Sequence, residues 1–302
     1  MQFMKSLNFI TIIAEEKSIR KASERLAITP SALNRRLLAI EEELRCPLFE
    51  RMASGVRLNT AGELFLHHIK RQQIDLERVR SQISDLEGMR RGHVNLVSSH
   101  HAVADIIAPE MAKYRRAYPR ITFSIQTCER EMAEYHLSEL NADLAITVGP
   151  VISSVFKTLA SISLAPVAVM RADHPLAQQP SIRFYECAEF PIIMPQKDDH
   201  ISSLIHLAQA ATGVTLDMVG SYDNLEFRNH YLQQEDAIGF DLPLAQSASM
   251  NNELITKHFA NSDIPATVVC LLQLGNRVLS VAAAKFAEQL VARLERQFPG
   301  TN

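Results

Sequence analysis

Four residues near the start of the chain are of kinds that contact DNA: Ser31, Asn34, Arg35 and Arg36. Arginine can form two hydrogen bonds to guanine and asparagine can do the same to adenine, while a hydroxyl can serve a base or a phosphate. A helix that begins here would add backbone N–H donors for phosphate. The segment therefore predicts contact with a DNA major groove. The alternative is that these side chains only solvate an exposed helix face.

Two further arginines lie on a predicted ribbon. Residues 47–51 and 56–58 flank a turn at 53–55 that contains a glycine, which is typical of two short strands joined by a tight turn. Arg51 and Arg57 on such a wing can reach phosphates or the minor groove.

Other residues suited to chemistry lack the partners that catalysis or metal binding requires. The pair His100-His101 and the run 198–200, Asp-Asp-His, have no complementary ligands at fixed spacing, which favours surface or pocket polarity. The sequence also has no P-loop, no G-x-S-x-G and no G-x-G-x-x-G. It therefore predicts no metal, no cofactor and no enzyme.

The four cysteines are widely scattered and form no C-x-x-C pair, which indicates reduced thiols in a reducing compartment. They are Cys46, Cys128, Cys187 and Cys270. The N-terminus has no signal-peptide pattern, and no stretch approaches the roughly 20 apolar residues that span a bilayer. We therefore expect a cytoplasmic protein with no membrane partner.

The candidate DNA-contacting residues need short helices to position them. Apolar spacing predicts a first helix that ends near Lys17, and Ser18 is expected to cap a second. Thr29 caps a third helix, with Pro30 at its first position, that extends to about Leu44. Two short helices joined by a tight turn form the helix-turn-helix pattern.

A long helix follows the ribbon. Thr60-Ala61-Gly62-Glu63 is a capping-box sequence, and apolar residues then recur at heptad spacing for about three repeats. Such a seam favours pairing with a second helix, and the alternative is packing on the chain's own body. The dimer seam is predicted to contain Phe65, Ile69, Leu76, Val79, Ile83 and Leu86.

From residue 93 onward, strands alternate with helices. Residues 94–97, 121–127 and 143–148 are predicted strands, and two helices lie between them, which is typical of a parallel α/β sheet. A second set of strands and helices starts near residue 165. Two lobes joined by two crossings would enclose a cleft at the carboxyl ends of their strands.

The overall charge conceals two unlike parts. The 302 residues carry a formal net charge of −3. Residues 1–92 hold 16 Lys+Arg and 12 Asp+Glu, a net of +4, so the remainder has a net of −7. A basic head on an acidic body is typical of a nucleic-acid-binding protein.

With these residues in order, the chain resembles the LysR-type transcriptional regulators over essentially its whole length. The specific match is residues 18–62, which follow the family's head in order and spacing. In this family the start of the recognition helix and the wing arginine contact DNA, which the resemblance carries onto Pro30, Ser31, Asn34, Arg35 and Arg51, and Thr29 at the same helix start is also predicted to contact DNA. Asn34 stands where serine is usual, which predicts an altered base preference, and Arg45 stands where glycine is usual at the helix end.

The resemblance implies an α/β protein with three parts: a winged helix-turn-helix (residues 1–59), a linker helix that dimerises (60–92) and a two-lobed effector domain similar to periplasmic binding proteins (93–302). Lobe one is expected to take residues 93–162 and 266–302, and lobe two residues 163–265. The implied function is a ligand-responsive, sequence-specific regulator that binds promoter DNA as a homodimer and homotetramer. RNA polymerase is a further candidate partner.

In this family the effector lies between the lobes, next to strand ends. The resemblance carries this site onto Ser98, Ser99, His100, Thr127, Cys128, Thr147, Val148, Met194, Gln196 and Ser202. The hydroxyl-rich strand ends favour a small ligand such as a carboxylate. Ser98 and Ser99 can instead be helix caps.

Two rival interpretations remain. The first is a solute-binding or enzymatic α/β protein whose head only oligomerises. The second keeps the regulator but makes Cys128 a redox sensor, for which no second cysteine close in sequence offers a disulfide partner.

Overall fold

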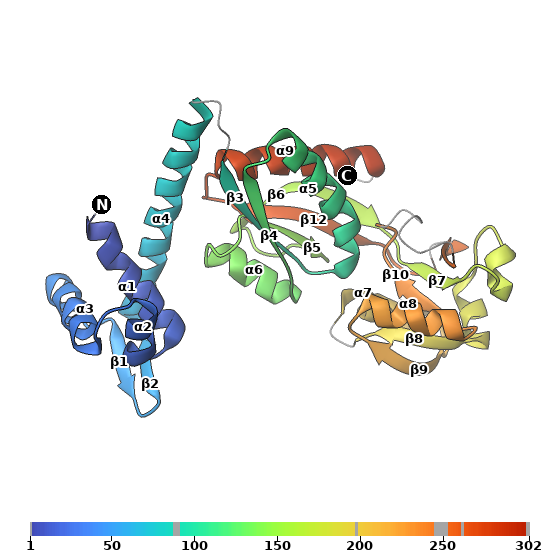
Figure 1. Ribbon diagram of the computed structural model, residues 1–302. Helices are drawn as coiled ribbons and strands as arrows, with labels where there is room; N and C mark the ends of the chain where they lie inside the picture. Colours follow the sequence, from blue (N-terminus) through green and yellow to red (C-terminus); the bar gives the residue numbers. More distant parts are fainter. Residues whose placement is uncertain (1, 87–90, 197–198, 245–252, 261–262, 300–302) are drawn as a thin grey trace. The chain divides into compact units, whose positions relative to one another are not determined.

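The computed structural model of the chain describes residues 2–86, 91–196, 199–244, 253–260 and 263–299. It divides into two compact units, Met1–Ile83 and Ser84–Asn302 (Figure 1). Each unit has its own apolar core. We call the first unit the head and the second the regulatory unit.

Three short helices form the head, as predicted: α1 (Gln2–Glu16), α2 (Ile19–Arg25) and α3 (Pro30–Leu44). The side chain of Ser18 accepts a hydrogen bond from the backbone N–H of Lys21 at the start of α2, and Thr29 does the same for Ala32 in α3. Pro30 occupies the first position of α3, where its missing N–H costs nothing. Local capping therefore sets where both helices begin.

The wing is also confirmed, as an antiparallel pair of β1 (Phe49–Met52) and β2 (Gly55–Leu58). Gly55 has φ +139°, and a Cβ there would lie 2.2 Å from the carbonyl oxygen of Lys17. That carbonyl accepts a hydrogen bond from Val56 N. The start of β2, next to the turn of the wing, is thus packed against the turn between α1 and α2, which only a glycine permits.

The long helix α4 (Thr60–Leu86) begins as predicted, but its cap is different. The side-chain oxygen of Asn59 accepts a hydrogen bond of 2.8 Å from Gly62 N, and its amide donates to the carbonyl of Pro47. The prediction that Thr60 caps the helix is therefore wrong by one residue. Asn59 reaches the third helical N–H, which leaves Thr60 as the first helical residue.

The predicted seam along α4 divides in two. Ile69 is fully buried in the head core and Phe65 packs against that core, so neither is free to meet a partner helix. Val79 and Ile83 are 46% and 53% exposed. The border between the two units consequently lies inside the helix. The side chain of Leu86 lies outside the described part of the chain.

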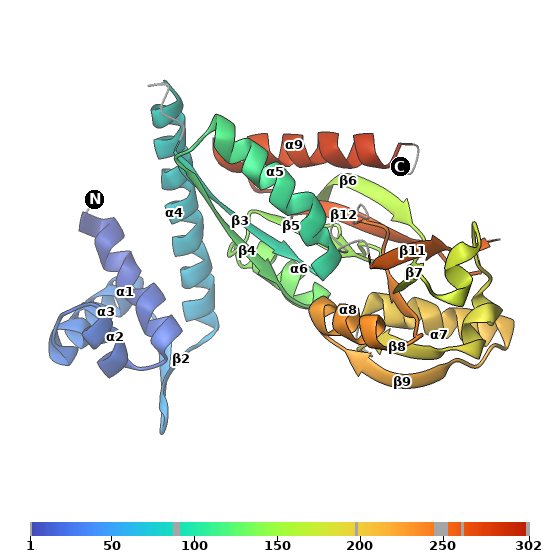
Figure 2. The same cartoon turned by 45° about the vertical axis from the view of Figure 1, so that its right-hand side comes forward.

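Lobe one of the regulatory unit is a five-stranded sheet in the order β4-β3-β5-β12-β6. β3, β4 and β5 are parallel as predicted, whereas β12 runs antiparallel to both neighbours. Helices α5 and α9 cover one face of this sheet and α6 covers the other (Figures 1 and 2). The elements are β3 (Gly92–Ser98), the short helix η1 (His101–Val103), α5 (Ala104–Ala117), β4 (Ile121–Thr127), α6 (Arg130–Ser138), β5 (Leu144–Val148), β6 (Phe156–Leu164), β12 (Thr267–Leu274) and α9 (Val281–Gln297).

Lobe two holds a three-stranded antiparallel sheet, β10-β7-β11, and a parallel pair, β8-β9. A single bridge between Ile192 and Ile238 links the two groups of strands. The elements are β7 (Val167–Arg171), η2 (Pro175–Gln178), η3 (Phe184–Glu189), β8 (Pro191–Pro195), α7 (His200–Thr212), β9 (Asp217–Tyr222), α8 (Leu225–Gln234), β10 (Gly239–Asp241) and β11 (Leu254–His258).

Two strands, β6 and β11, were not predicted. Both lie beside antiparallel partners, and neither is followed by a helix, so the alternation of strand and helix that reveals the parallel part gives no signal for them. β6 also extends lobe one to Leu164, two residues beyond its predicted end. Among the described residues, no helix is both long and apolar enough to cross a membrane.

The corrected cap of α4 is testable by amide hydrogen exchange on the whole chain. Replacing Asn59 with alanine removes the acceptor for Gly62 N, and losing such a cap costs about 1 kcal/mol. We expect exchange across residues 61–63 to accelerate about fivefold. Asn59→Asp keeps the acceptor and should retain most of the protection. An equal or larger effect of Thr60→Ala would contradict the assignment.

Candidate functional site

The head gathers four predicted DNA-contacting residues around one hollow. Pro30, Ser31 and Asn34 come from the first turns of α3, and Arg51 comes from β1. Together with residues of α2 and β2 they line a depression of about 480 Å³. The start of α3 and the wing therefore meet at one place on the head.

The other predicted residues of the head have distinct environments. Thr29 does not line the hollow; its hydroxyl caps α3 and lies 3.2 Å from that of Ser31. Arg35 is exposed on α3. The guanidinium of Arg36 lies 4.7 Å from the ring centre of Phe9, a stacking that joins α3 to α1.

Arg57 on the wing donates a hydrogen bond of 3.0 Å to Glu50 on the neighbouring strand. Both side chains are largely exposed, so this pair adds little stability. Arg57 can therefore exchange Glu50 for a phosphate at little cost.

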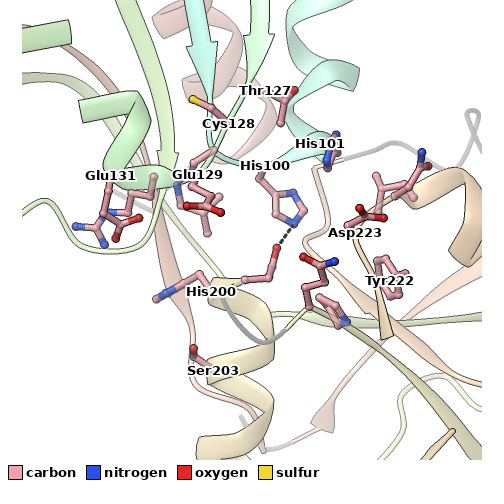
Figure 3. A pocket seen from close by; sticks show the side chains of 18 residues that line it. His100, His101, Thr127, Cys128, Glu129, Glu131, His200, Ser203, Tyr222 and Asp223 are labelled. Atoms are coloured by element: carbon pink, nitrogen blue, oxygen red, sulfur yellow. Dashed lines mark hydrogen bonds and ion pairs between the residues drawn. The ribbon is translucent and has the colours of Figure 1, made fainter. Parts of the chain in front are cut away.

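The regulatory unit has a cavity of about 680 Å³ between its lobes (Figure 3). Lobe one contributes the end of β3, the start of α6 and the end of β5. Lobe two contributes the segments between β8 and α7 and between β9 and α8. The lining residues are Ser99, His100, His101, Thr127, Cys128, Glu129, Arg130, Glu131, Val148, Pro195, Gln196, Asp199, His200, Ser203, Tyr222, Asp223, Asn224 and Leu225.

Six of the ten predicted effector-site residues line this cavity: Ser99, His100, Thr127, Cys128, Val148 and Gln196. The cavity lining does not include Ser98, Thr147, Met194 or Ser202, all of which are buried. The prediction that these four residues line the cavity is therefore wrong, because their side chains do not face it. Alternation along a strand turns Thr147 to the same side as Ala145, and one residue along α7 replaces Ser202 with Ser203.

Neither serine of the first loop is a helix cap. The hydroxyl of Ser98 donates to the carbonyl of His100, and that of Ser99 accepts a hydrogen bond of 2.9 Å from Val148 N. The first bond lies within the loop, and the second fastens the loop to β5. α5 itself has no side-chain cap.

Sequence reasoning missed most of the residues that begin a helix at the cavity. α6, α7 and α8 start there at Arg130, His200 and Leu225, and η1, which leads into α5, starts at His101. The first N–H groups of a helix lack intrahelical partners and carry partial positive charge. The alternation of strand and helix in the sequence could have identified these residues, because each of these helices follows a predicted strand.

Two of these helix starts are satisfied from within the chain. Asp199 accepts a hydrogen bond of 2.7 Å from Ile201 N, and Asn224 accepts one of 2.7 Å from Glu226 N. α5 and α6 have no side-chain cap. The guanidinium of Arg130, at the start of α6, lies in the cavity wall and donates to Glu134 at 3.3 Å.

The wall formed by α8 is held by a buried ion pair. Arg228 is a buried residue of α8 that pairs with Asp241 and donates to the carbonyl of Phe240. The same carbonyl accepts a hydrogen bond of 2.9 Å from the hydroxyl of Tyr222, so this hydroxyl faces the lobe core rather than the cavity. Removing either charge would leave the other buried and unpaired, at a cost of about 3–5 kcal/mol.

Comparison with known proteins places the two units in one family. The description "Bacterial regulatory helix-turn-helix protein, lysR family" matches residues 4–63. The description "LysR substrate binding domain" matches residues 87–295, well over half of the chain. The chain belongs to the LysR family.

Curated relatives of this LysR-family chain are regulators by name. The HTH-type transcriptional regulator AlsR of Bacillus subtilis is 25% identical over 200 residues, which is 65% of each protein. The uncharacterised regulator YbhD of Escherichia coli is 28% identical over 63% of this chain and 60% of its own length. The chain thus matches less than two thirds of either relative.

Solved structures agree in fold. Full-length OxyR from Pseudomonas aeruginosa aligns with a TM-score of 0.69 and 15% identity, covering 97% of this chain and 94% of OxyR. The effector binding domain of QuiR in complex with shikimate has a TM-score of 0.56 and 17% identity, and covers 69% of this chain and 99% of that domain. At these identities the likeness concerns the fold alone.

Cys128 of the LysR-family chain lies in the cavity wall as a thiol that is half buried. Burial, and then the nearby Glu129 carboxylate, raise the pKa of Cys128 above its ordinary value. Cys270 lies three strands away across the sheet order, about 14 Å at the usual strand spacing, and a disulfide needs less than 7 Å between Cα atoms. Both observations disfavour a disulfide switch at Cys128. No group of three metal-ligating side chains is assembled within the described ranges.

The pKa of Cys128 gives a direct test of this environment. Since the thiolate is the reactive form, iodoacetamide should alkylate Cys128 with an apparent pKa above that of an ordinary thiol. Replacing Glu129 with glutamine should lower that pKa, while Glu131→Gln should leave it unchanged. The pH dependence of the rate is measured by mass spectrometry of the Cys128 peptide. An apparent pKa below the ordinary range would revive the redox-sensing interpretation.

Proposed function

We propose that this chain is a ligand-responsive, sequence-specific DNA-binding transcriptional regulator that acts in the cytoplasm. The observation that carries the proposal is the meeting of Ser31, Asn34 and Arg51 at one hollow of a basic head. Asn34 and Ser31 stand at the start of a helix, where side chains can enter a major groove and backbone donors can meet phosphate. Arg51 on the wing supplies a phosphate or minor-groove contact.

The regulator is proposed to act as a homodimer that assembles into a homotetramer. Val79 and Ile83 are exposed apolar residues one turn apart on α4, and they suit pairing with the same helix of a second copy. A dimer would present two copies of α3 to successive major grooves, about 34 Å apart. The operator would then consist of two inverted half-sites.

The effector is proposed to be a small anion, such as a carboxylate, bound in the cavity between the lobes. The start of α6, which has no side-chain cap, and the guanidinium of Arg130, which pairs with Glu134 at 3.3 Å, favour negative charge there. Binding would bias the closure of the lobes and so the arrangement of the subunits on DNA.

The rival function is a solute-binding or enzymatic protein whose head serves only for assembly. It gives no role to Asn34 or Arg51, so their removal would leave function intact. We propose a binding protein and assign it no reaction. The support is that polar residues gather in the hollow of the head as well as in the cavity between the lobes.

Substitutions in the head should separate base reading from phosphate binding. We expect Asn34→Ala to weaken binding to the best operator by about 5–150-fold and to relax its sequence preference. Arg51→Ala should weaken binding to all sequences similarly and reduce the slope of log K against log salt by about 1. Both are measured by fluorescence anisotropy with DNA from upstream of the chain's own gene and neighbouring genes.

The matched control is Arg116→Ala, which removes the same charge from an exposed site on the regulatory unit. It should leave affinity within twofold of the parent. Footprinting should protect two half-sites about one helical turn apart. Binding without sequence preference, or equal effects of all three substitutions, would contradict the proposed function.

The proposed effector class is testable by thermal shift. A ligand present at 100 times its Kd stabilises the folded state by about 2.7 kcal/mol, which is about 5–10 °C for a unit of this size. We expect a small carboxylate to give such a shift, its uncharged amide to give none, and Arg130→Gln to reduce it. A hit among cations or neutral compounds, with none among anions, would overturn the anionic assignment.

A further inference from the structure

The two lobes are joined across the cavity by the first turn of α7. Asp199 and His200 belong to lobe two, yet each makes a polar contact with a residue of lobe one. We propose that these two side chains are positioning residues that form a latch, which holds the cavity walls together without any effector. The inference rests on the proposed function only in taking the cavity as the effector site.

The contact across the cavity joins His100 and Asp199. His100 Nε2 lies 3.9 Å from Asp199 Oδ2, and His100 is only 7% exposed (Figure 3). The other oxygen of Asp199 is held by Ile201 N at 2.7 Å. Because the cap fixes one oxygen, the carboxylate has little freedom to turn its second oxygen away from His100.

The second contact lies beside the crossings of the chain. His200 Nε2 is 2.7 Å from the hydroxyl of Thr267, the first residue of β12 in lobe one. Thr267 pairs with Leu164, the last residue of β6, just where the chain passes to lobe two. Burial, followed by the positive charge of Arg130, lowers the pKa of His200, so the neutral ring is the form that occupies this place.

The backbone of lobe one leaves no spare room around His200. A Cβ on Gly149 would lie 3.3 Å from the ring of His200 and 2.9 Å from the guanidinium of Arg130. His200 is therefore packed against the end of β5 as well as hydrogen-bonded to β12. The His200 ring is therefore closely packed as well as hydrogen-bonded at this place, which is more than a chance approach of two surfaces.

Two contacts at different distances from the crossings define the angle between the lobes. The bond to Thr267 alone would leave rotation about it possible, and the pair with His100 removes that rotation. The latch thereby sets the width of the cavity. An effector either fits this width or has to break the latch contacts. Its residues act on the ligand through the geometry of the walls.

The test uses Cys128 in the cavity wall as a probe of opening, with no DNA or effector present. Its alkylation rate by iodoacetamide at pH 6.5, divided by the thiolate fraction taken from its own pH profile, reports access, and Cys46 in the head, treated in the same way, is the internal reference. We expect Asp199→Asn and His200→Ala each to raise the rate of Cys128 relative to Cys46 at least threefold. Asparagine can still cap α7, so Asp199→Asn removes the charge with the least disturbance.

Two matched variants distinguish a latch from a general loosening. His200→Gln can still bond to Thr267 and should restore the parental rate. Asp223→Asn removes the same charge from another cavity-lining residue and should leave the rate unchanged. Thr267→Val removes the bond from the other side and should match His200→Ala, which keeps the test valid where one variant fails to fold.

The latch is overturned by unchanged Cys128 access in Asp199→Asn and His200→Ala. It is equally overturned by His200→Gln behaving like His200→Ala, or by Asp223→Asn opening the cavity as much as Asp199→Asn. Because the assay contains neither DNA nor effector, failure of the DNA-binding proposal would leave its result intact. Failure of the latch proposal would likewise leave the DNA-binding result intact.

Discussion

The cavity depends on the way the chain connects its strands. It passes between the lobes twice, at the end of β6 and before β12, and four helices begin directly after parallel strands at the facing edges: α5 after β3, α6 after β4, α7 after β8 and α8 after β9. Parallel strands put all such turns at their carboxyl ends. The turns that lead into four helices are therefore gathered at one place, whatever side chains surround them.

The helix starts at the cavity differ in whether a side chain caps them. Asp199 and Asn224 satisfy the starts of α7 and α8, whereas α5 and α6 have no such cap. The two lobes therefore differ in how their helix starts are satisfied at the cavity. Asp199 has a second role, because the oxygen that does not cap its helix is directed to His100 on the opposite wall.

In the head, by contrast, nearly every positioning feature is local. Ser18, Thr29 and Asn59 each accept a backbone hydrogen bond at the start of the helix that follows. Arg45 ends α3 in the left-handed conformation, at the position where the family usually has glycine. Caps and turns of this kind act over three or four residues, so the sequence pattern indicated them correctly except for the one-residue displacement at Asn59.

The sequence by itself determined where the short helices of the head begin and the three parallel strands of lobe one, because these depend on neighbours in the chain. Only the tertiary structure decided that Ile69 belongs to the head core while Val79 and Ile83 are exposed, that Thr147 and Ser202 do not line the cavity, and that His200 meets Thr267. Side-chain direction reverses with each strand residue and turns by about 100° with each helix residue, so being near a site along the chain does not place a side chain in it. Contacts between residues 67 positions apart depend on how the lobes pack, which no local pattern records.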